Sequence, residues 1–245
     1  MSNNNKLIVV LGSGPGIGSS TGALFASKGF NVALLSRNVE RLDQDVARVQ
    51  AANPRVKVQA YPVDVGDHNA LALALGKVVT DLGLPEVVYF NAARVAPSRI
   101  GGTSPDFLLE DFKSMNLGLF VAASWALPHL TAAAEQPGTH PSFLFTNSGL
   151  WDRPLADFTS LSMQKAAQYN LMLSLKQTVE AKGVHVGGVN IGGLVREEDP
   201  VTNANNVARA LFDMSQQDRP NWQWEVKVGD WAEFLKQMAA AQEAA

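Results

Sequence analysis

The sequence predicts a doubly wound parallel α/β sheet of about seven strands with helices on both faces. Short runs of β-branched and aromatic residues alternate with longer helical patterns, and the first six runs are apolar at nearly every position. Continuous apolar runs are typical of parallel strands that helices cover on both faces. The alternation itself favours right-handed crossovers in one open sheet. No linker-like run of Ser, Gly or Pro divides the chain, so we expect residues 1–245 to form a single domain.

The expected strands are short and rich in Val, Leu, Phe and Tyr. In chain order they are Leu7–Leu11, Val32–Leu35, Val56–Tyr61, Val87–Phe90, Phe143–Thr146, Val184–Ile191 and Trp224–Val228. The segments between them have the length and pattern of helices. These predicted helices are Ile17–Lys28, Val39–Ala51, His68–Asp81, Asp106–Ala133, Thr159–Ala181 and Ala204–Met214. The Asn-rich start, Asn3–Asn5, and the Ala-rich end after Met238 are expected to be frayed tails.

Composition is that of an ordinary globular protein. Hydrophobic residues make up 46% of the chain and charged residues 18%, which is enough apolar material to fill a core between helices and a sheet. The formal net charge is −3, which gives no reason to expect the basic surface that nucleic acid requires. We therefore expect a small-molecule partner and no nucleic acid.

No residue pattern indicates a metal site or a disulfide. The chain has no cysteine, and its four histidines show no i, i+4 ligand pair. The amino-terminal residues Met1–Lys6 are polar, and the longest apolar stretch, Leu117–Leu127, is shorter than the ~20 residues that a membrane span requires. We expect a cytoplasmic protein without a membrane segment.

A glycine-rich turn follows the first predicted strand and opens directly into a helix. It reads Gly12-Ser13-Gly14-Pro15-Gly16-Ile17-Gly18. Glycine lets the backbone turn tightly and approach a pyrophosphate, and the free N–H groups at a helix N-terminus favour an anion. Because the turn lies between a strand and a helix, it predicts a dinucleotide site of the Rossmann type more strongly than a turn without a ligand.

The glycines Gly12, Gly16 and Gly18 form the spacing G-x-x-x-G-x-G. This spacing near the start of a chain of 245 residues resembles the short-chain dehydrogenase/reductase family, and the similarity continues over nearly the whole length. The resemblance implies hydride transfer to or from a nicotinamide cofactor. It also implies a homodimer or homotetramer formed through the long helices and the last strand.

The end of the second strand favours NADP(H) over NAD(H). Where an NAD-preferring relative carries an acidic residue to hold the ribose hydroxyls, this sequence has Ser36. Arg37 beside it can pair with a 2′-phosphate through charge-assisted hydrogen bonds. Many NADP-preferring relatives have a second basic residue at the position of Pro15, so only one cationic contact is visible here.

Two further strand ends resemble cofactor-binding elements of the family. Asp64 and Val65 follow the third strand and resemble its adenine-contacting pair. Asn91 and Ala92 follow the fourth strand and begin a segment that resembles its Asn-Ala-Gly element. Either pair alone could be an ordinary strand-end turn, but their order and spacing after the glycine turn favour a cofactor site.

Three of the four catalytic positions of the family are matched. The resemblance assigns Ser148 to the serine that hydrogen-bonds the carbonyl and Lys165 to the lysine that also binds the nicotinamide ribose. Asn116 matches the asparagine that helps to hold a proton-relay water.

The fourth position, one helical turn before Lys165, is Leu161 instead of the tyrosine that transfers the proton. Loss of a general acid lowers such rates by about 10²–10⁴. Tyr169, one turn beyond the lysine, is a candidate for the missing acid but is expected to serve helix packing. Ser160 and Ser162 could hold a water near Lys165 but are expected to be helix-surface residues.

After the sixth strand, Asn190–Leu194 resembles the Asn-Pro-Gly loop of the family with isoleucine in place of proline. The backbone at Gly192 and Leu194 is expected to reach the nicotinamide carboxamide. Only about ten residues separate this loop from the next helix, which suggests an open substrate site. Trp151 and Phe158 are candidates for the substrate pocket, and equally for the core or a subunit interface.

Two functions follow from these patterns. The first is an NADP(H)-dependent oxidoreductase that acts on a small carbonyl or alcohol, as the retained Ser148, Asn116 and Lys165 suggest. The second is an NADP(H)-binding sensor or scaffold with weak or no catalysis, as Leu161 suggests.

Overall fold

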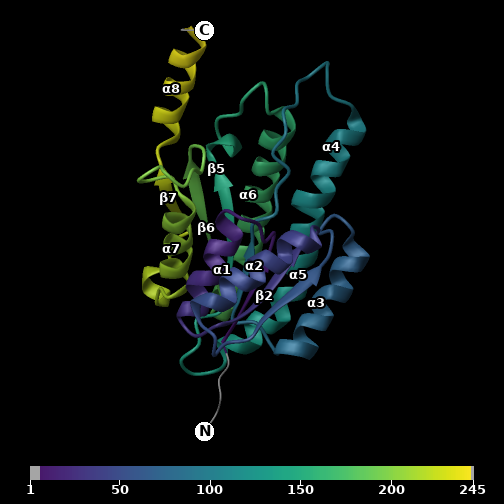
Figure 1. Cartoon of the computed structure of the whole chain (residues 1–245), viewed down its shortest axis with the longest axis vertical. Coiled ribbons are helices and arrows are strands. Elements are labelled where there is room, and N and C mark those ends of the chain that lie inside the picture. Colours follow the sequence, from purple (N-terminus) through teal and green to yellow (C-terminus); the bar gives the residue numbers. More distant parts are fainter. Residues whose placement is uncertain (1–5, 244–245) are drawn as a thin grey trace.

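The computed structural model describes residues 6–243 and shows one seven-stranded sheet between two layers of helices (Figure 1). All neighbouring strands are parallel, in the order β3-β2-β1-β4-β5-β6-β7. The strands are β1 Leu7–Leu11, β2 Asn31–Ser36, β3 Val58–Pro62, β4 Val87–Phe90, β5 Ser142–Ser148, β6 His185–Gly192 and β7 Glu225–Gly229. The predicted number, order and type of strands are confirmed, with shifts of one or two residues at most ends.

The helices alternate with these strands as the sequence predicts. They are α1 Ile17–Ser27, α2 Val39–Ala52, α3 His68–Leu82, α4 Pro105–Phe112, α5 Gly118–Ala134, α6 Thr159–Val179, α7 Ala204–Ser215 and α8 Trp231–Glu243. Five starts carry the side-chain caps that free N–H groups require, from Asn38, Asp67, Ser104, Asn203 and Asp230. The start of α1 has no side-chain cap, which matters for the site described below.

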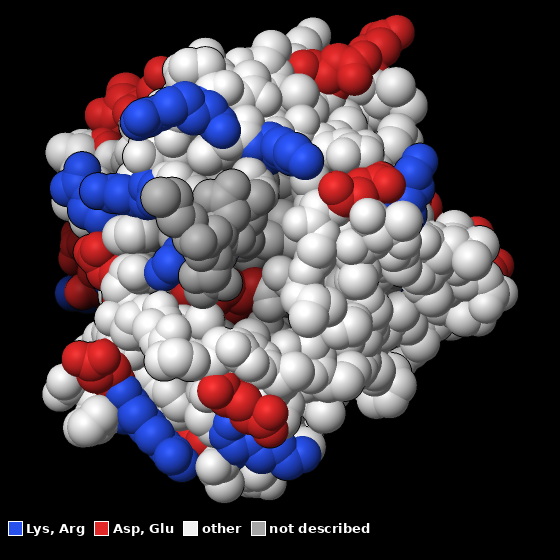
Figure 2. Space-filling model, turned by 90° about the horizontal axis from the view of Figure 1, so that it is seen from below, with Lys and Arg blue, Asp and Glu red and all other residues white. Residues whose placement is uncertain are grey.

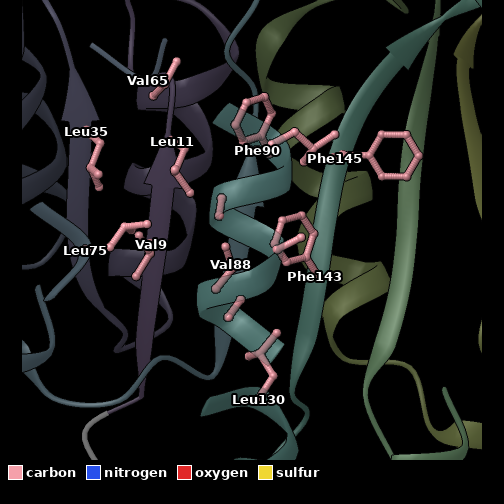
Figure 3. Packing of buried hydrophobic residues seen from close by; sticks show 14 of the residues in the cluster. Val9, Leu11, Leu35, Val65, Leu75, Val88, Phe90, Leu130, Phe143 and Phe145 are labelled. Carbon is pink, nitrogen blue, oxygen red and sulfur yellow. The ribbon is translucent and has the colours of Figure 1, made fainter. Parts of the chain in front are cut away.

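The two faces of the sheet are covered by different helices. Along β1, Leu7, Val9 and Leu11 face one core with α3, α5 and α6, whereas Ile8 and Val10 face the other with α1, α2 and α7. Figure 3 shows the first of these cores, where Val88, Phe90 and Phe143 pack around α5. Every residue of β1 is fully buried, because successive side chains of a strand point to opposite faces and helices cover both.

The strand order reverses between β1 and β4, which are direct neighbours in register from Ile8↔Val87 to Leu11↔Phe90. The chain winds outward from β1 to β3 and then crosses back to β4. Ligands of open α/β sheets bind at such a reversal, beyond the carboxyl ends of the strands. The fold therefore brings the turns after β1 and β4 to one place.

The predicted long helix Asp106–Ala133 is present, but it contains a wider turn. Residues Lys113–Leu117 form one turn of π-helix between α4 and α5, and Asn116 lies within it. The whole segment Pro105–Ala134 is long and apolar enough, by length and composition alone, to cross a membrane, a test that core helices of globular proteins also pass. Leu119 and Leu130 of this helix are buried against the sheet, as in a core helix.

One prediction about the chain ends is wrong. The segment after Met238 belongs to α8, which continues to Glu243, rather than to a frayed tail. Asp230 caps this helix, since its carboxylate accepts hydrogen bonds from the backbone N–H groups of Ala232 and Glu233. In Figure 1 the helix projects away from the sheet. The other predicted tail, Asn3–Asn5, lies outside the described residues.

The end of the molecule that carries the amino-terminal edge of the sheet is shown in Figure 2. On its described surface, Lys and Arg side chains alternate with Asp and Glu side chains, and no broad patch of one sign is visible. This mixed surface agrees with the small net charge. It is not the positive surface that tracks a nucleic acid backbone.

Candidate cofactor site and reaction centre

A cavity of about 270 Å³ lies beyond the carboxyl ends of β1, β2, β3 and β4. Eight of the residues that the sequence assigned to cofactor binding line it together: Gly12, Ser13, Ser36, Arg37, Asp64, Val65, Asn91 and Ala92. They come from four separate strand ends. The reversal of strand order is what places them around one space.

The glycines of the first turn fall into two classes. At Gly12, φ is +95°, and a Cβ atom would lie 2.5 Å from the backbone N of Ala92. At Gly18, a Cβ atom would lie 2.6 Å from the carbonyl oxygen of Gly12. These two glycines are required by the packing of the fold itself. Gly14 and Gly16 have no such neighbour within 4 Å, so their backbone is open to a ligand.

The start of α1 has the chemistry of an anion site. Gly16 provides no side-chain cap, and no acidic residue lies in the first turn from Ile17 onward. The N–H groups at this end carry positive partial charge and point out of the helix toward the turn. A pyrophosphate placed there would satisfy them, so the residues present fit a dinucleotide.

The turn is braced from α2 by two side chains that the sequence did not single out. Asp45 is 3% exposed and accepts a hydrogen bond of 2.7 Å from the hydroxyl of Ser13. Arg48 donates to the hydroxyls of Ser19 and Ser20, at 2.9 and 3.0 Å, and to the carbonyl of Pro15. An acid and a base three residues apart on a helix normally indicate a solvated face, so nothing in the sequence identified this brace.

Arg37 and Asp64 face each other across the mouth of the cavity. Nη1 of Arg37 lies 3.7 Å from Oδ2 of Asp64, and the two side chains are 61% and 47% exposed. Such an exposed pair contributes little stability. Arg37 therefore can turn from Asp64 to another anion at small cost, and Ser36 beside it adds no negative charge.

Asn91 connects three elements at the floor of the site. Its Nδ2 donates to the carbonyl of Gly12, and its Oδ1 accepts from the hydroxyls of Tyr89 and Thr146. All three distances are between 2.8 and 3.0 Å. Asn91 thus holds the glycine turn, β4 and β5 in fixed relation.

Lys165 lies on α6 beside the end of β5. Its Nζ donates to the carbonyl of Thr146 at 3.0 Å, and the residue is 8% exposed. Burial lowers the pKa of Lys165 to about 8, because removal from water disfavours the charged ammonium. Lys165 does not line the cavity around the glycine turn. It lies beside β5, the strand next to β4, whose end borders that cavity.

Asn116 is bound to the helix that carries the lysine. Its Nδ2 donates to Oε1 of Gln164 at 2.6 Å, and its Oδ1 is buried without a hydrogen-bond partner within residues 6–243. Asn116 lies in the π-helical turn Lys113–Leu117, so this hydrogen bond joins that turn to α6. Ser148 ends β5, and its hydroxyl accepts a weak hydrogen bond of 3.4 Å from the N–H of Leu150.

The tyrosine position is occupied by hydrocarbon. Leu161 is 5% exposed and forms an apolar cluster with Met115 and Leu150, against which Phe158 and Trp231 pack. This cluster gives Phe158 a packing role next to the reaction centre. A leucine here supplies neither a proton donor nor an acceptor.

All three tyrosines of the chain are engaged elsewhere. Tyr61 donates to Asp81, Tyr89 donates to Asn91, and the hydroxyl of Tyr169 accepts a hydrogen bond from Nε1 of Trp224. Tyr169 also stacks on Trp151, with ring centroids 3.9 Å apart and planes 5° apart. The packing role expected for Tyr169 is confirmed, and no phenol lies at the position of the missing acid.

The prediction that Ser160 and Ser162 lie on the helix surface is wrong. Ser160 is fully buried and donates to Asp111 at 2.5 Å, and Ser162 is 4% exposed and donates to the carbonyl of Phe158. Asp111 is itself 1% exposed and lies 2.8 Å from Nη1 of Arg94. An ion pair between buried Asp111 and the 28% exposed Arg94 therefore lies beside Leu161. Sequence spacing did not reveal it, because Ser160 is far from both residues in the chain.

Six predicted cofactor residues do not line the cavity at the glycine turn: Gly16, Ile17 and Gly18 at the start of α1, Lys165 on α6, Gly192 and Leu194. Gly192 ends β6 and lines a separate cavity with Trp151 and Trp231. Leu194 is 55% exposed and lines neither cavity. Within the described chain, no group of three or more His, Asp or Glu side chains is arranged to hold a metal ion.

Known proteins match this chain over most of its length. The pattern of the short chain dehydrogenase family matches residues 6–205. An uncharacterized oxidoreductase of Staphylococcus aureus is 29% identical over 192 residues, which cover 77% of this chain and 78% of that protein. Meso-2,3-butanediol dehydrogenase of Serratia marcescens is 28% identical over 131 residues, so the match spans 52% of this chain and only 49% of that enzyme.

Solved structures confirm the fold. An NADPH-bound short chain oxidoreductase of Pseudomonas aeruginosa PAO1, described as containing an atypical catalytic center, superposes with a TM-score of 0.81. The superposition covers 91% of this chain and 95% of that chain at 22% identity. At this identity the likeness establishes the architecture.

The two classes of glycine predict opposite effects of added methyl groups. Gly12→Ala forces a positive φ and a clash with Ala92, so we expect it to lower the free energy of unfolding by about 2 kcal/mol or more. Gly14→Ala meets open space and should change stability by less than about 0.5 kcal/mol while weakening nucleotide binding. Urea unfolding of both variants measures the difference, and equal losses would contradict the distinction.

Proposed function

The chain belongs to the short-chain dehydrogenase family, and on this premise we propose that it is an NADP(H)-dependent oxidoreductase of a small carbonyl or alcohol. The observation that carries the proposal is the cavity in which the glycine turn meets Ser36, Arg37, Asp64 and Asn91. Its shape and its uncapped helix end suit a dinucleotide, and the lysine of the reaction centre lies one strand further along.

The preference for NADP(H) is supported by charge at the mouth of the cavity. Ser36 leaves the end of β2 without a carboxylate that would repel a 2′-phosphate. Arg37 is exposed and, among residues 6–243, pairs with Asp64 alone, so its guanidinium is available to a phosphate. Asp64 would then be released to meet the adenine end of the cofactor, as the resemblance implies.

When bound, a nicotinamide cofactor supplies the hydride chemistry. The ammonium of Lys165 would hold the ribose hydroxyls, and the hydroxyl of Ser148 would hydrogen-bond the substrate oxygen. Because position 161 has no phenol, Nζ of Lys165 is the remaining proton donor. Its pKa of about 8 supports this role, since acid catalysis is most effective when the donor titrates near the working pH. Asn116 and Gln164 hold α6 against the π-helical turn and so position Lys165.

A second function is favoured by one observation, the apolar cluster around Leu161. Hydrocarbon at the point of proton transfer suits a protein that binds NADP(H) as a sensor or a scaffold with little turnover. The two functions share the cofactor site and differ in the reaction centre. Incubation with NADPH and a broad panel of carbonyls separates them, because robust oxidation of NADPH supports the oxidoreductase alone.

We also propose a cytoplasmic homodimer or homotetramer that does not enter a membrane. Large apolar side chains on the outer helices support self-association: Phe112, Phe120 and Met163 are 46%, 55% and 54% exposed. Their positions on α4, α5 and α6 are those through which the family resemblance implies association.

Replacement of Arg37 by Gln should weaken NADPH binding about 10- to 100-fold, as expected for one charged hydrogen-bond partner worth about 1.5–3 kcal/mol. NADH binding should change little, because NADH lacks the 2′-phosphate. Arg55→Gln, an exposed arginine after α2, serves as the matched control and should leave both affinities unchanged. Calorimetric titration provides the affinities. Equal losses for the two nucleotides would contradict the role of Arg37.

The pKa of Lys165 predicts a pH dependence of cofactor binding. Because the pKa is lowered to about 8, the ammonium is present at pH 7 and is lost as the pH rises through this value. NADPH affinity should therefore be constant near neutral pH and fall above about pH 8, with the midpoint displaced upward if the cofactor stabilises the ammonium. Lys165→Met should bind more weakly and without this pH step. A wild-type profile that is flat to pH 10 would refute the assignment.

Leu161→Tyr restores the phenol one turn before Lys165. If the rest of the centre is arranged for catalysis, NADPH oxidation with an accepted carbonyl should increase by about 10² or more. Leu161→Phe adds similar bulk without the hydroxyl and controls for repacking of the cluster around Met115 and Leu150. Steady-state rates that rise equally in both variants would show that packing, and not proton transfer, had limited the reaction.

A further inference from the structure

A second cavity, of about 240 Å³, lies beyond the ends of β6 and β7 and shares no lining residue with the cofactor cavity. Its floor comes from paired positions of the two strands, since Asn190 lies opposite Lys227 and Gly192 opposite Gly229. The turn after β5 and the start of α8 form its walls.

Two lining glycines make room for the start of α8. At Gly149, a Cβ atom would lie 2.0 Å from Cγ of Trp231, and at Gly192 it would lie 2.6 Å from the backbone N of Asp230. The indole of Trp231 is therefore seated directly on the turn that follows Ser148. One side of this indole borders the cavity, and the same residue packs against the cluster that contains Leu161.

Two of the three acidic groups of the cavity accept hydrogen bonds within the protein. Glu225 accepts a hydrogen bond of 3.1 Å from Asn190. Asp230 accepts two backbone hydrogen bonds at the start of α8, which lower the pKa of its carboxyl. Asp152 lies at the exposed rim, 4.0 Å from Arg153.

The cavity also has two cationic groups, Lys227 and Arg153. Lys227 is exposed and forms no ion pair within the part of the chain that the structure describes. Arg153 lies 4.0 Å from Asp152, and its charge also acts on the carboxyl of Asp230. Beside the three carboxylates of the lining, the ammonium of Lys227 is thus the cationic donor that is free to bind a ligand with an anionic acceptor, and Arg153 lies at the rim.

The apolar part of the wall is aromatic. Trp151 is held in place by its stack on Tyr169, and Trp231 lies on Gly149. The Nε1 atoms of both indoles are buried without a hydrogen-bond partner among residues 6–243. Aromatic walls with a few polar groups are typical of sites for small organic molecules, and flat apolar groups pack well on indoles.

We propose that this cavity binds a small organic carboxylate with a flat apolar body. Its carboxylate group is held by Lys227 and Arg153, and its body packs against Trp151 and Trp231. Because Trp231 also packs against the cluster at Leu161, a ligand in the cavity contacts a residue that borders the reaction centre. Its lining contains none of Ser148, Asn116, Lys165 and Leu161 and shares no residue with the cavity at the glycine turn, although Gly192 is a residue that the family resemblance assigns to the nicotinamide.

The experiment titrates the full chain with benzoate and with its neutral isostere benzamide by calorimetry, with and without saturating NADP⁺. Benzoate should bind at least about tenfold more tightly than benzamide, because only benzoate carries the charge. Lys227→Gln should weaken benzoate about tenfold or more, whereas Lys77→Gln, an exposed lysine on α3, should have no effect. Benzoate should still bind when NADP⁺ is present.

The proposal is overturned if benzoate gives no heat of binding up to about 10 mM, or if benzamide binds equally well. It is also overturned if Ser148→Ala abolishes benzoate binding while Lys227→Gln leaves it intact, because the ligand would then occupy the reaction centre. Arg153→Gln, at the exposed rim, is the second variant if Lys227→Gln does not fold. A loss of benzoate binding with NADP⁺ binding intact would leave the proposed function standing.

Discussion

The close approach of the turn after β1 to the end of β4 is the constraint on which the rest of the site depends. Gly12 lies so near Ala92 that no side chain fits between them, and Asn91 ties the same turn to β5 through Thr146. Because these contacts fix three strand ends together, the open backbone at Gly14 faces a space whose walls are already set. The site is therefore preorganised, and binding of the cofactor does not carry the free-energy cost of ordering these strand ends.

The reaction centre keeps the lysine of the family, Lys165, but has an apolar side chain, Leu161, at the position of the tyrosine. Lys165 keeps its hydrogen bond to the carbonyl of Thr146, while Leu161 fills the preceding turn of α6 with hydrocarbon, and the ion pair between Arg94 and buried Asp111 packs against that turn. Ser160 joins this pair to the helix. A buried charge is costly unless it is paired, so these residues hold α4 and α6 in one arrangement. These contacts of α6 with α4 and β5 can thus position Lys165 without a phenol beside it.

The parts of the structure that follow from local pattern were predictable from the sequence. Apolar runs identified all seven strands, and the glycine turn with Ser36, Asp64 and Asn91 identified one cavity. Helix α8 was not predicted, because its signal is a cap at Asp230 and an indole that needs Gly149 as its seat, two positions far apart in the chain. The hydrogen bond between Ser13 and Asp45 was not predicted for the same reason, because burial of a carboxylate on a helix depends on a partner that is distant in the chain.

The contact of Trp231 with Gly149 also constrains how this protein can change over generations. A side chain cannot be gained at position 149 while the indole is in place, since even a methyl group would overlap the ring. Loss of the indole in turn would remove a wall from both the second cavity and the cluster at Leu161. Positions 149 and 231 should therefore covary among descendants of this sequence, although they lie 82 positions apart in the chain.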